Sequence, residues 1–310
     1  MKNRFPDFFL IGAPKCGTTS LFDWLRQHPD VYLPVKEPNF LSGDVLDVSS
    51  HPGAIRSEAE YLDRLCPTEA ANKLTGDATP KYLYSDIALD RLAREAEHVR
   101  LVVLLRNPVD LASAMYAQNV REGYENEFDF ARAWARGPAT ADDRMTDYRF
   151  WGRPGSRLEK YFAVIPRNRI LVLLLEEEMR HDPASAHAKV LDFLGLTPQT
   201  LDSYTTKNPR RISRSPHLQG LSRRARRSTY AALERIGLNP KGTGLLKLFD
   251  LLNHNRLGRH NLPVGLRVKI AAELADDARR IAKCLERASL PWDDFDWGQP
   301  RAAPLGKKNT

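Results

Sequence analysis

Three runs of consecutive apolar residues stand out from the otherwise mixed polar and apolar pattern of the chain. They are Phe8–Ile11, Arg100–Leu105 and Arg169–Leu175. Continuous apolar runs of this length are typical of strands that are buried on both faces of a parallel sheet, whereas half-exposed strands alternate. The pattern therefore predicts that these segments are strands, the last two of them central.

Elsewhere, apolar residues recur at the spacing of helices. The predicted helices are Ser85–His98, Val109–Arg121, Arg157–Phe162, Pro183–Leu194 and a long amphipathic one over Val264–Leu290. Strand and helix alternate through the first two thirds of the chain, which favours a mainly parallel sheet. We therefore expect an α/β fold, with the sheet flanked by helices and a helical C-terminal extension.

This pattern also predicts the organisation of the chain. Residues 1–215 form the α/β core, residues 216–297 a helical part packed on that core, and residues 298–310 a flexible tail. No internal repeat is visible. A length of 310 residues is sufficient to bury a large core.

Charge and cysteine content narrow the classes of function. The chain has 47 Lys and Arg against 39 Asp and Glu, a net charge of +8, which suits an anionic ligand without requiring nucleic acid. Cys16, Cys66 and Cys284 lie far apart and show no zinc-site or disulfide spacing, and the histidines show no ligand spacing. With no apolar signal region or membrane-length apolar run in the sequence, we expect a cytoplasmic protein.

The first strand leads into a glycine loop with an unusual cation. Gly12 and Gly17 keep the glycine spacing of a Walker loop, but Thr18 and Thr19 follow where that motif has Lys and Ser/Thr, and the lysine lies inside the loop as Lys15. We expect Thr18 or Thr19 to cap the next helix. Helix N-termini bind anions through free N–H groups and the helix dipole, so the loop is interpreted as a phosphate site.

A second candidate anion site follows the Arg100–Leu105 strand. Magnesium-dependent P-loop enzymes commonly have an Asp there, whereas this strand is followed by Arg106, Asn107 and Pro108. Pro108 suits the first turn of a helix, which places Arg106 at the carboxyl edge of the sheet, where α/β folds bind ligands. Two anion sites and no visible magnesium ligand indicate a nucleotide with phosphates at two positions.

These segments resemble those of sulfotransferases that use 3′-phosphoadenosine 5′-phosphosulfate (PAPS), in the bacterial and heparan-sulfate-like branch. PKCGTTSL is similar to the 5′-phosphosulfate loop, KEPNFL to the acidic catalytic segment, GDATPKYL to the substrate-side segment and RNPVDLASAMY to the 3′-phosphate segment. The resemblance covers residues 6–215 and implies a three-layer P-loop-like fold, with residues 1–215 as the PAPS-binding core. It also implies that no metal is needed.

The resemblance assigns roles to individual residues. Glu37 would be the general base, with Lys36 beside it and Lys15 nearest the bridging oxygen of the donor. Asp77, Thr79 and Tyr82 would line the acceptor side. The cofactor would be held by a larger set: Pro14, Lys15, Cys16, Gly17, Thr18, Thr19 and Ser20 at the 5′ end, and Arg106, Ser113 and Arg211 at the 3′ end.

Two positions depart from the family pattern, and one arginine-rich stretch is open to several interpretations. The serine of the 3′-phosphate segment is replaced by Ala114, so Ser113 is the nearest hydroxyl. The lysine that heparan-modifying relatives carry before the Ser/Thr-Pro pair is replaced by Ala78. The arginine-rich stretch Arg210–Arg227 is interpreted first as a solvated face, then as a lid over the cofactor, and third as a nucleic-acid or membrane patch.

The predicted activity is transfer of a sulfuryl group from PAPS to a hydroxyl, or in second place an amine, of a small molecule, glycan or lipid. Two alternatives stay open: a magnesium-dependent nucleotide kinase, which predicts a Lys beside Gly17, and a non-catalytic protein that binds adenosine 3′,5′-bisphosphate (PAP). The identity of the acceptor and the oligomeric state are not encoded in any pattern that we recognise.

Overall fold

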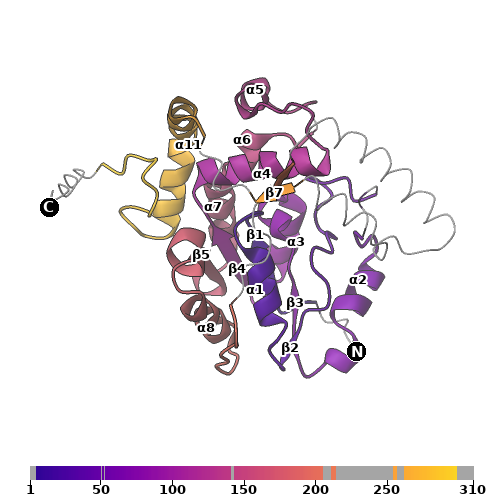
Figure 1. Ribbon diagram of the computed structural model, residues 1–310. Coiled ribbons are helices and arrows are strands. Elements are labelled where there is room, and N and C mark those ends of the chain that lie inside the picture. Colours follow the sequence, from indigo (N-terminus) through magenta and orange to yellow (C-terminus); the bar gives the residue numbers. More distant parts are fainter. Residues whose placement is uncertain are drawn as a thin grey trace.

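The computed structural model describes residues 5–49, 51, 53–140, 143–204 and 262–298, together with the backbone of residues 211–213 and 254–256. Its central sheet has five strands in the order β2-β3-β1-β4-β5 (Figure 1). The strands are β1 (Phe8–Gly12), β2 (Val31–Tyr32), β3 (Leu74–Asp77), β4 (Arg100–Leu105) and β5 (Ile170–Leu174).

Every pair of neighbouring strands in this sheet is parallel. The predicted parallel sheet is therefore confirmed, and the apolar runs are its strands. The prediction that Arg169–Leu175 is a central strand is wrong, because β5 lies at the edge of the sheet and is only partly buried at Leu171 and Val172. β1 is buried along its whole length and β4 is buried at every position after Arg100. Helices on both faces are the reason: a strand that is covered twice needs no polar alternation.

The helices form two layers around the sheet. In chain order they are α1 (Thr18–Leu25), α2 (Glu58–Leu65), α3 (Asp86–Arg94), α4 (Pro108–Glu122), α5 (Phe130–Arg136), α6 (Tyr148–Trp151), α7 (Pro154–Val164), α8 (Pro183–Leu194) and α11 (Val264–Cys284). α1 packs on α8, and α3 packs on α7. Right-handed crossovers place these two pairs on opposite faces, because β1 to β2 and β3 to β4 run in opposite directions across the sheet.

Short helical turns and a small hairpin complete the structure. The turns are η1 (Thr68–Ala70), η2 (Pro80–Tyr84), η3 (Arg167–Arg169) and η4 (Leu175–Met179). Strands β6 (Arg211–Ser213) and β7 (His254–Arg256) pair with each other in antiparallel fashion, and the backbone of β6 lies against α4.

Several predicted element bounds need correction. The helix predicted over Ser85–His98 begins at Asp86, because the hydroxyl of Ser85 caps it by accepting from the Ala88 N–H, and it ends at Arg94. The helix predicted over Val264–Leu290 ends at Cys284, and the chain then turns through Glu286 in the left-handed conformation. Leu290, Trp292 and Phe295 are buried after this turn, so the segment returns to the core.

The C-terminal helix is attached to the core by buried contacts. α11 packs on α7 and α4 (Figure 1). Both carboxylate oxygens of Asp277 accept hydrogen bonds at the start of α7, from the N–H groups of Gly155 at 2.6 Å and Ser156 at 2.8 Å. Arg267 binds Asp110 of α4 and Asp294. The domain boundaries at residues 215 and 297 stay predictions, since residues 214–253 and 299–310 lie outside the described part of the chain.

Candidate active site

The glycine loop connects the carboxyl end of β1 to α1. Gly17 occupies the N-cap position of α1 with φ of 95°, a left-handed value that favours glycine. The expectation that Thr18 or Thr19 caps this helix is therefore wrong: both residues lie inside its first turn. A left-handed cap turns the chain sharply, which leaves the first N–H groups of α1 facing the loop without intrahelical acceptors.

Lys15 is the cation of this loop. Its backbone has φ of 63°, an uncommon conformation for a residue with a side chain. Burial, the largest cause, and Arg121 together lower the pKa of Lys15 to about 8, while Glu122 and Glu37 oppose the shift. The partly buried ammonium group therefore lies within electrostatic range of the end of α4 and of Glu37.

The remaining loop side chains divide into buried and accessible ones. Cys16 is fully buried and its Sγ lies 3.4 Å from the Pro14 carbonyl oxygen, while burial raises the pKa of its thiol well above the ordinary range. Thr18 and Ser20 are also buried, whereas Lys15 and Thr19 are partly accessible. The predicted cofactor contacts of these loop residues stay predictions.

The segment around Glu37 reaches the same edge of the sheet. Lys36 forms a parallel bridge with Ala78, and the Glu37 N–H donates to the Ala78 carbonyl oxygen at 3.1 Å. This bridge extends the β2–β3 pairing beyond the carboxyl end of β3. Glu37 has φ of 57° and Asn39 has φ of 54°, so two left-handed residues turn the chain here. The Nδ2 of Asn39 donates to the Glu37 carbonyl oxygen at 2.7 Å and supports the turn.

The carboxylate of Glu37 is held between two ammonium groups. Lys36 contacts Oε1, and the Nζ of Lys81 lies 3.2 Å from Oε2. Burial alone would raise the pKa of Glu37, but Lys81 and Lys36 together lower it to about 2. At neutral pH the group is therefore a carboxylate, which is the form that a proton acceptor requires.

The predicted acceptor-side residues form a buried network within electrostatic range of Glu37; they are Asp77, Thr79 and Tyr82. The Tyr82 hydroxyl donates to Asp77 at 2.9 Å and the Thr79 hydroxyl at 2.6 Å, and all three side chains are buried. Tyr61 donates a third hydrogen bond to Asp77 at 2.8 Å. In this conformation the three predicted residues support the base segment, and their direct contact with an acceptor stays a prediction.

Arg106, the predicted second anion site, lies directly beside the loop. Its Nη1 donates to the Lys15 carbonyl oxygen at 3.2 Å, and its Nη2 lies 3.3 Å from Asp110. The side chain is buried. Within the described residues, its Nε and the Oε1 of Glu176 are buried without a hydrogen-bond partner, 4.0 Å apart. The two predicted anion sites are therefore neighbours, joined by a hydrogen bond.

The other predicted 3′-phosphate residues are placed less completely. Ser113 and Ala114 are both buried on α4. Arg211 begins β6, whose backbone lies against α4, but its side chain lies outside the described residues, as does the rest of the arginine-rich stretch Arg210–Arg227 apart from the backbone of residues 211–213. The predicted roles of Ser113 and Arg211 stay predictions.

Some residues at this edge were not identified from the sequence. Lys81 contacts the base, and Arg121 and Glu122 influence Lys15 across the loop. Asp110 pairs with both Arg106 and Arg267. Lys81 and Asp110 lie inside the motifs GDATPKYL and RNPVDLASAMY, but the motifs did not single them out, because their contacts form only through tertiary packing. A lysine two residues after Thr79, within the same motif, was the one available signal for Lys81.

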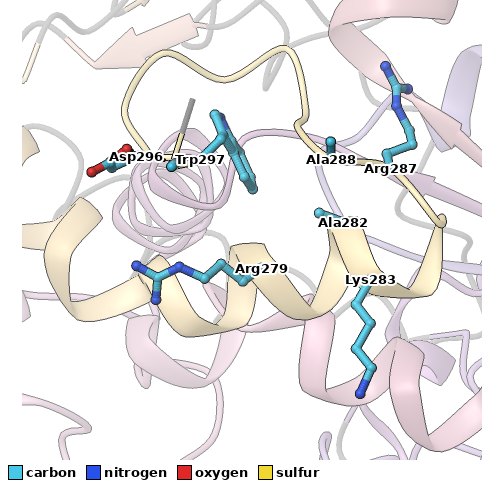
Figure 2. Close-up of a pocket in the computed structure, with 8 residues that line it drawn as sticks. Arg279, Ala282, Lys283, Arg287, Ala288, Asp296 and Trp297 are labelled. Atoms are coloured by element: carbon cyan, nitrogen blue, oxygen red, sulfur yellow. Dashed lines mark hydrogen bonds between the residues drawn. The ribbon is translucent and has the colours of Figure 1, made fainter. Parts of the chain in front are cut away.

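A pocket of about 420 Å³ lies elsewhere, between α11 and the segment that follows it. It is lined by Arg279, Ala282, Lys283, Arg287, Ala288, Asp296, Trp297 and Gly298. Figure 2 shows the ends of Arg279, Lys283 and Arg287 reaching in different directions instead of converging on one point. These three cations therefore do not converge as the ligands of an anion-binding site would.

The described residues contain neither a metal-ligand cluster nor a membrane-spanning helix. No three His, Cys, Asp or Glu side chains of these residues group as metal ligands would. None of the helices in the described part combines the length and the apolar character that crossing a bilayer demands. No disulfide bond joins Cys16, Cys66 and Cys284.

A parallel α/β sheet with a glycine loop at the carboxyl edge of β1 is the architecture of P-loop-like proteins. The family model of the sulfotransferase domain matches residues 5–211, more than half of the chain. The protein therefore belongs to the sulfotransferase family, as the motifs predicted.

Curated relatives agree with this family. The chain is 27% identical over 203 residues to human heparan sulfate glucosamine 3-O-sulfotransferase 6, covering 66% of this chain and 56% of the relative. It is 29% identical over 194 residues to mouse heparan sulfate glucosamine 3-O-sulfotransferase 3B1, covering 62% of this chain and 47% of the relative. The chain thus spans about half the length of these relatives.

A solved structure supports the fold. A sulfotransferase from Alicyclobacillus acidocaldarius superposes with a TM-score of 0.66 at 23% identity, over 92% of this chain and 97% of that chain. The predicted P-loop-like fold with a helical C-terminal part is therefore confirmed.

Proposed function

We propose that this protein transfers a sulfuryl group from PAPS to a hydroxyl group, with Glu37 as the general base. The observation that carries the proposal is the meeting of Lys15, Glu37 and Arg106 at one edge of the sheet. Arg106 is bonded to the Lys15 carbonyl oxygen, and Lys15 and Glu37 influence each other electrostatically. A cationic loop, a carboxylate and a second cation are the three parts that in-line transfer from a doubly phosphorylated donor requires.

The residues present fit such a donor. The accessible side chains of Lys15 and Thr19 and the N–H groups that start α1 would hold the 5′ phosphate. Arg106, whose Nε is buried and has no hydrogen-bond partner in the described part of the chain, would hold the 3′ phosphate together with Ser113 and Arg211. When bound, PAPS supplies the sulfuryl group and a phosphate leaving group.

The chain's own groups then perform two tasks. The Glu37 carboxylate accepts the proton of the attacking hydroxyl while the new oxygen–sulfur bond forms. Lys15 and the loop N–H groups stabilise the negative charge that collects on the phosphate oxygen as the old sulfur–oxygen bond breaks. Both groups already lie at this edge of the sheet in the free protein.

The acceptor is proposed by analogy with the relatives. Their names describe 3-O-sulfation of heparan sulfate glucosamine, which favours a glycan hydroxyl over a small molecule or a lipid. A more distant relative, 24% identical, is named a bifunctional heparan sulfate N-deacetylase/N-sulfotransferase, which keeps an amine as the second choice. No observation on this chain favours the kinase or the binding-only alternative.

The test supplies PAPS, a chelator and a panel of glycan, small-molecule and lipid acceptors, and follows the sulfonate by mass spectrometry and PAP release by chromatography. We expect an acceptor that gains one sulfonate, with matching release of PAP. Absence of PAPS binding by calorimetry would refute the proposal. Transfer of a phosphoryl group from ATP in the presence of magnesium would replace it with the kinase.

A further inference from the structure

The carboxylate proposed as the base has both oxygens occupied by cations. Lys36 contacts Oε1 of Glu37, and Lys81 lies 3.2 Å from Oε2. A carboxylate in this state is ionised but is a poor proton acceptor, because each ammonium stabilises the charged form that protonation would remove. Base catalysis works best when the pKa of the base lies near the working pH. One of the two ammonium groups therefore has to leave before Glu37 can act.

Lys36 and Lys81 differ in how firmly they are held. The side chain of Lys81 is 10% exposed, and that of Lys36 is 22% exposed. Lys36 lies in a segment joined to the sheet by a single bridge, next to the left-handed Glu37. Lys81 lies inside η2, a turn of five residues that is buried throughout.

The neighbour of Lys81 in this turn fixes its backbone. The Tyr82 hydroxyl donates to Asp77 at 2.9 Å and accepts from the Leu41 N–H at 3.2 Å. The Tyr82 carbonyl oxygen accepts a hydrogen bond of 2.7 Å from Tyr161 of α7. Three hydrogen bonds to three different segments thus anchor Tyr82. They hold in place the backbone from which the neighbouring side chain of Lys81 extends.

We propose that Lys81 is a positioning residue that holds Oε2 of Glu37 throughout the reaction, while Lys36 moves from Oε1 to the sulfonate of the donor. Withdrawal of Lys36 opens Oε1 as the oxygen that receives the acceptor's proton. Heparan-modifying relatives carry a lysine directly before the Ser/Thr-Pro pair, and this chain has Ala78 there. Lys81 supplies a cation beside the base in this chain. This inference rests on the proposed function, and its test separates the two.

The decisive measurement is the titration of the Glu37 carboxyl group by carbon-13 NMR, assigned by comparison with Glu37→Gln. It is made on the free protein and with PAP or PAPS bound. We expect PAPS to raise the pKa of Glu37 and PAP, which has no sulfonate, to leave it almost unchanged. In Lys36→Met the pKa is already raised and PAPS adds nothing. In Lys81→Met it is raised in the free protein, and PAPS raises it further.

Other titratable groups lie near Glu37 and have to be controlled. Lys15, His51 and Asp77 each interact with it electrostatically. The titrations are therefore repeated in the His51→Gln background, which removes the histidine that interacts with Glu37. Lys269→Met, on an exposed face of α11, is the matched control and leaves every Glu37 titration unchanged.

Kinetics on an acceptor found in the screen give a second measurement. Lys81→Met lowers kcat on the order of 100-fold, the effect of misplacing a catalytic group by about an ångström, and leaves donor affinity unchanged. Lys81→Arg restores part of kcat, because a guanidinium can hold the same oxygen. Lys36→Met lowers kcat and also weakens PAPS binding relative to PAP.

The outcomes are distinguishable. If neither PAP nor PAPS binds, the proposed function fails. If PAPS binds but leaves the pKa of Glu37 unchanged, or raises it equally in Lys36→Met, the division of roles between the two lysines is overturned. If Lys81→Met lowers both kcat and thermal stability, and Lys81→Arg restores neither, Lys81 is a structural residue and the proposed positioning role is overturned.

Discussion

The glycine loop and the base segment lie at the same edge of the sheet but are built in opposite ways. The loop joins β1 to α1, and Gly17 and Lys15 follow one another within a single strand–turn–helix unit. The base segment has no regular structure beyond one bridge to Ala78, and its geometry depends on Lys81. The first region is set by neighbours in sequence and the second by contacts over more than forty positions.

This difference predicts how each region responds to change. Under the proposed function, the backbone conformation and one cation of the loop would bind the donor, so single substitutions there would act on ligand binding and leaving-group stabilisation. At the base, the proposal assigns proton transfer to the charge balance among Glu37, Lys36 and Lys81, so substitutions there would act on that step. A single substitution that changed both ligand binding and proton transfer would weaken this distinction between the loop and the base segment.

The largest expected effect comes from Glu37→Gln. We expect kcat to fall by about 10²–10⁴, the range of general-base contributions, because an amide cannot accept the proton. PAP affinity measured by calorimetry stays nearly unchanged, since the loop is intact. Glu60→Gln on the exposed surface of α2 is the control and keeps full activity. Normal turnover by Glu37→Gln would remove Glu37 from the base role.

The second largest effect is expected for Lys15→Ala. Removal of one charge-stabilising donor typically costs about 10²–10³ in kcat, and we expect a loss in this range. PAPS binding also weakens, unlike in Glu37→Gln, and this contrast separates loop from base. The measurement is steady-state kinetics combined with calorimetry, with exposed Lys269→Ala as the control. A Lys15→Ala variant that retains both rate and affinity would contradict the loop assignment.

Asp77→Ala tests the support beneath the base segment. It leaves the hydroxyls of Tyr61, Tyr82 and Thr79 buried without their acceptor. We expect a loss of about 3 kcal/mol or more in the free energy of unfolding, from urea denaturation. Asp77→Asn, which keeps one acceptor oxygen, loses less, and exposed Asp63→Ala loses almost nothing. Equal stability of Asp77→Ala and Asp63→Ala would show that the network contributes little.

The same residue gives a pH dependence. Burial raises the pKa of Asp77 from 3.8 to about 6, although its three hydroxyl donors oppose this shift. Between these values the folded protein binds more protons at Asp77 than the unfolded chain, so its contribution to stability falls as the pH rises from about 4 to about 6. Wild type therefore gains stability relative to Asp77→Asn on acidification through this window. Parallel curves for the two proteins would contradict the raised pKa.

The smallest effect is expected for Gly17→Ala. A side chain at φ of 95° is strained by about 1–2 kcal/mol, and its Cβ would lie 3.2 Å from Leu175. Gly195 at the end of α8 also has a positive φ, of 73°, but nothing lies within 4 Å of an added Cβ. We expect both Ala variants to lose stability in thermal unfolding, and only Gly17→Ala to bind PAP more weakly. Unchanged affinity in Gly17→Ala would show that the loop tolerates a different cap.

Much of the fold could be predicted because strand burial and helix caps leave local signals. β4 spans Arg100–Leu105 and α8 spans Pro183–Leu194, as the apolar pattern indicated. The cap of α1 was predicted wrongly because threonines are favoured caps, and the left-handed Gly17 that takes this position leaves no periodic signal. The end of α11 was also predicted wrongly. The apolar pattern continues as far as Leu290, although the left-handed turn at Glu286 has already ended the helix.

The sequence alone determined the strands β1, β4 and β5, the position of Lys15 in a glycine loop and the place of Arg106 after a buried strand, because each follows from neighbours within a few residues. Only the tertiary structure decided that Arg106 touches the loop backbone, that Asp77 is a buried acceptor, and that Lys81 completes the surroundings of Glu37. Those contacts depend on burial and on electrostatic interactions between distant segments, and neither is encoded in any local pattern of residues.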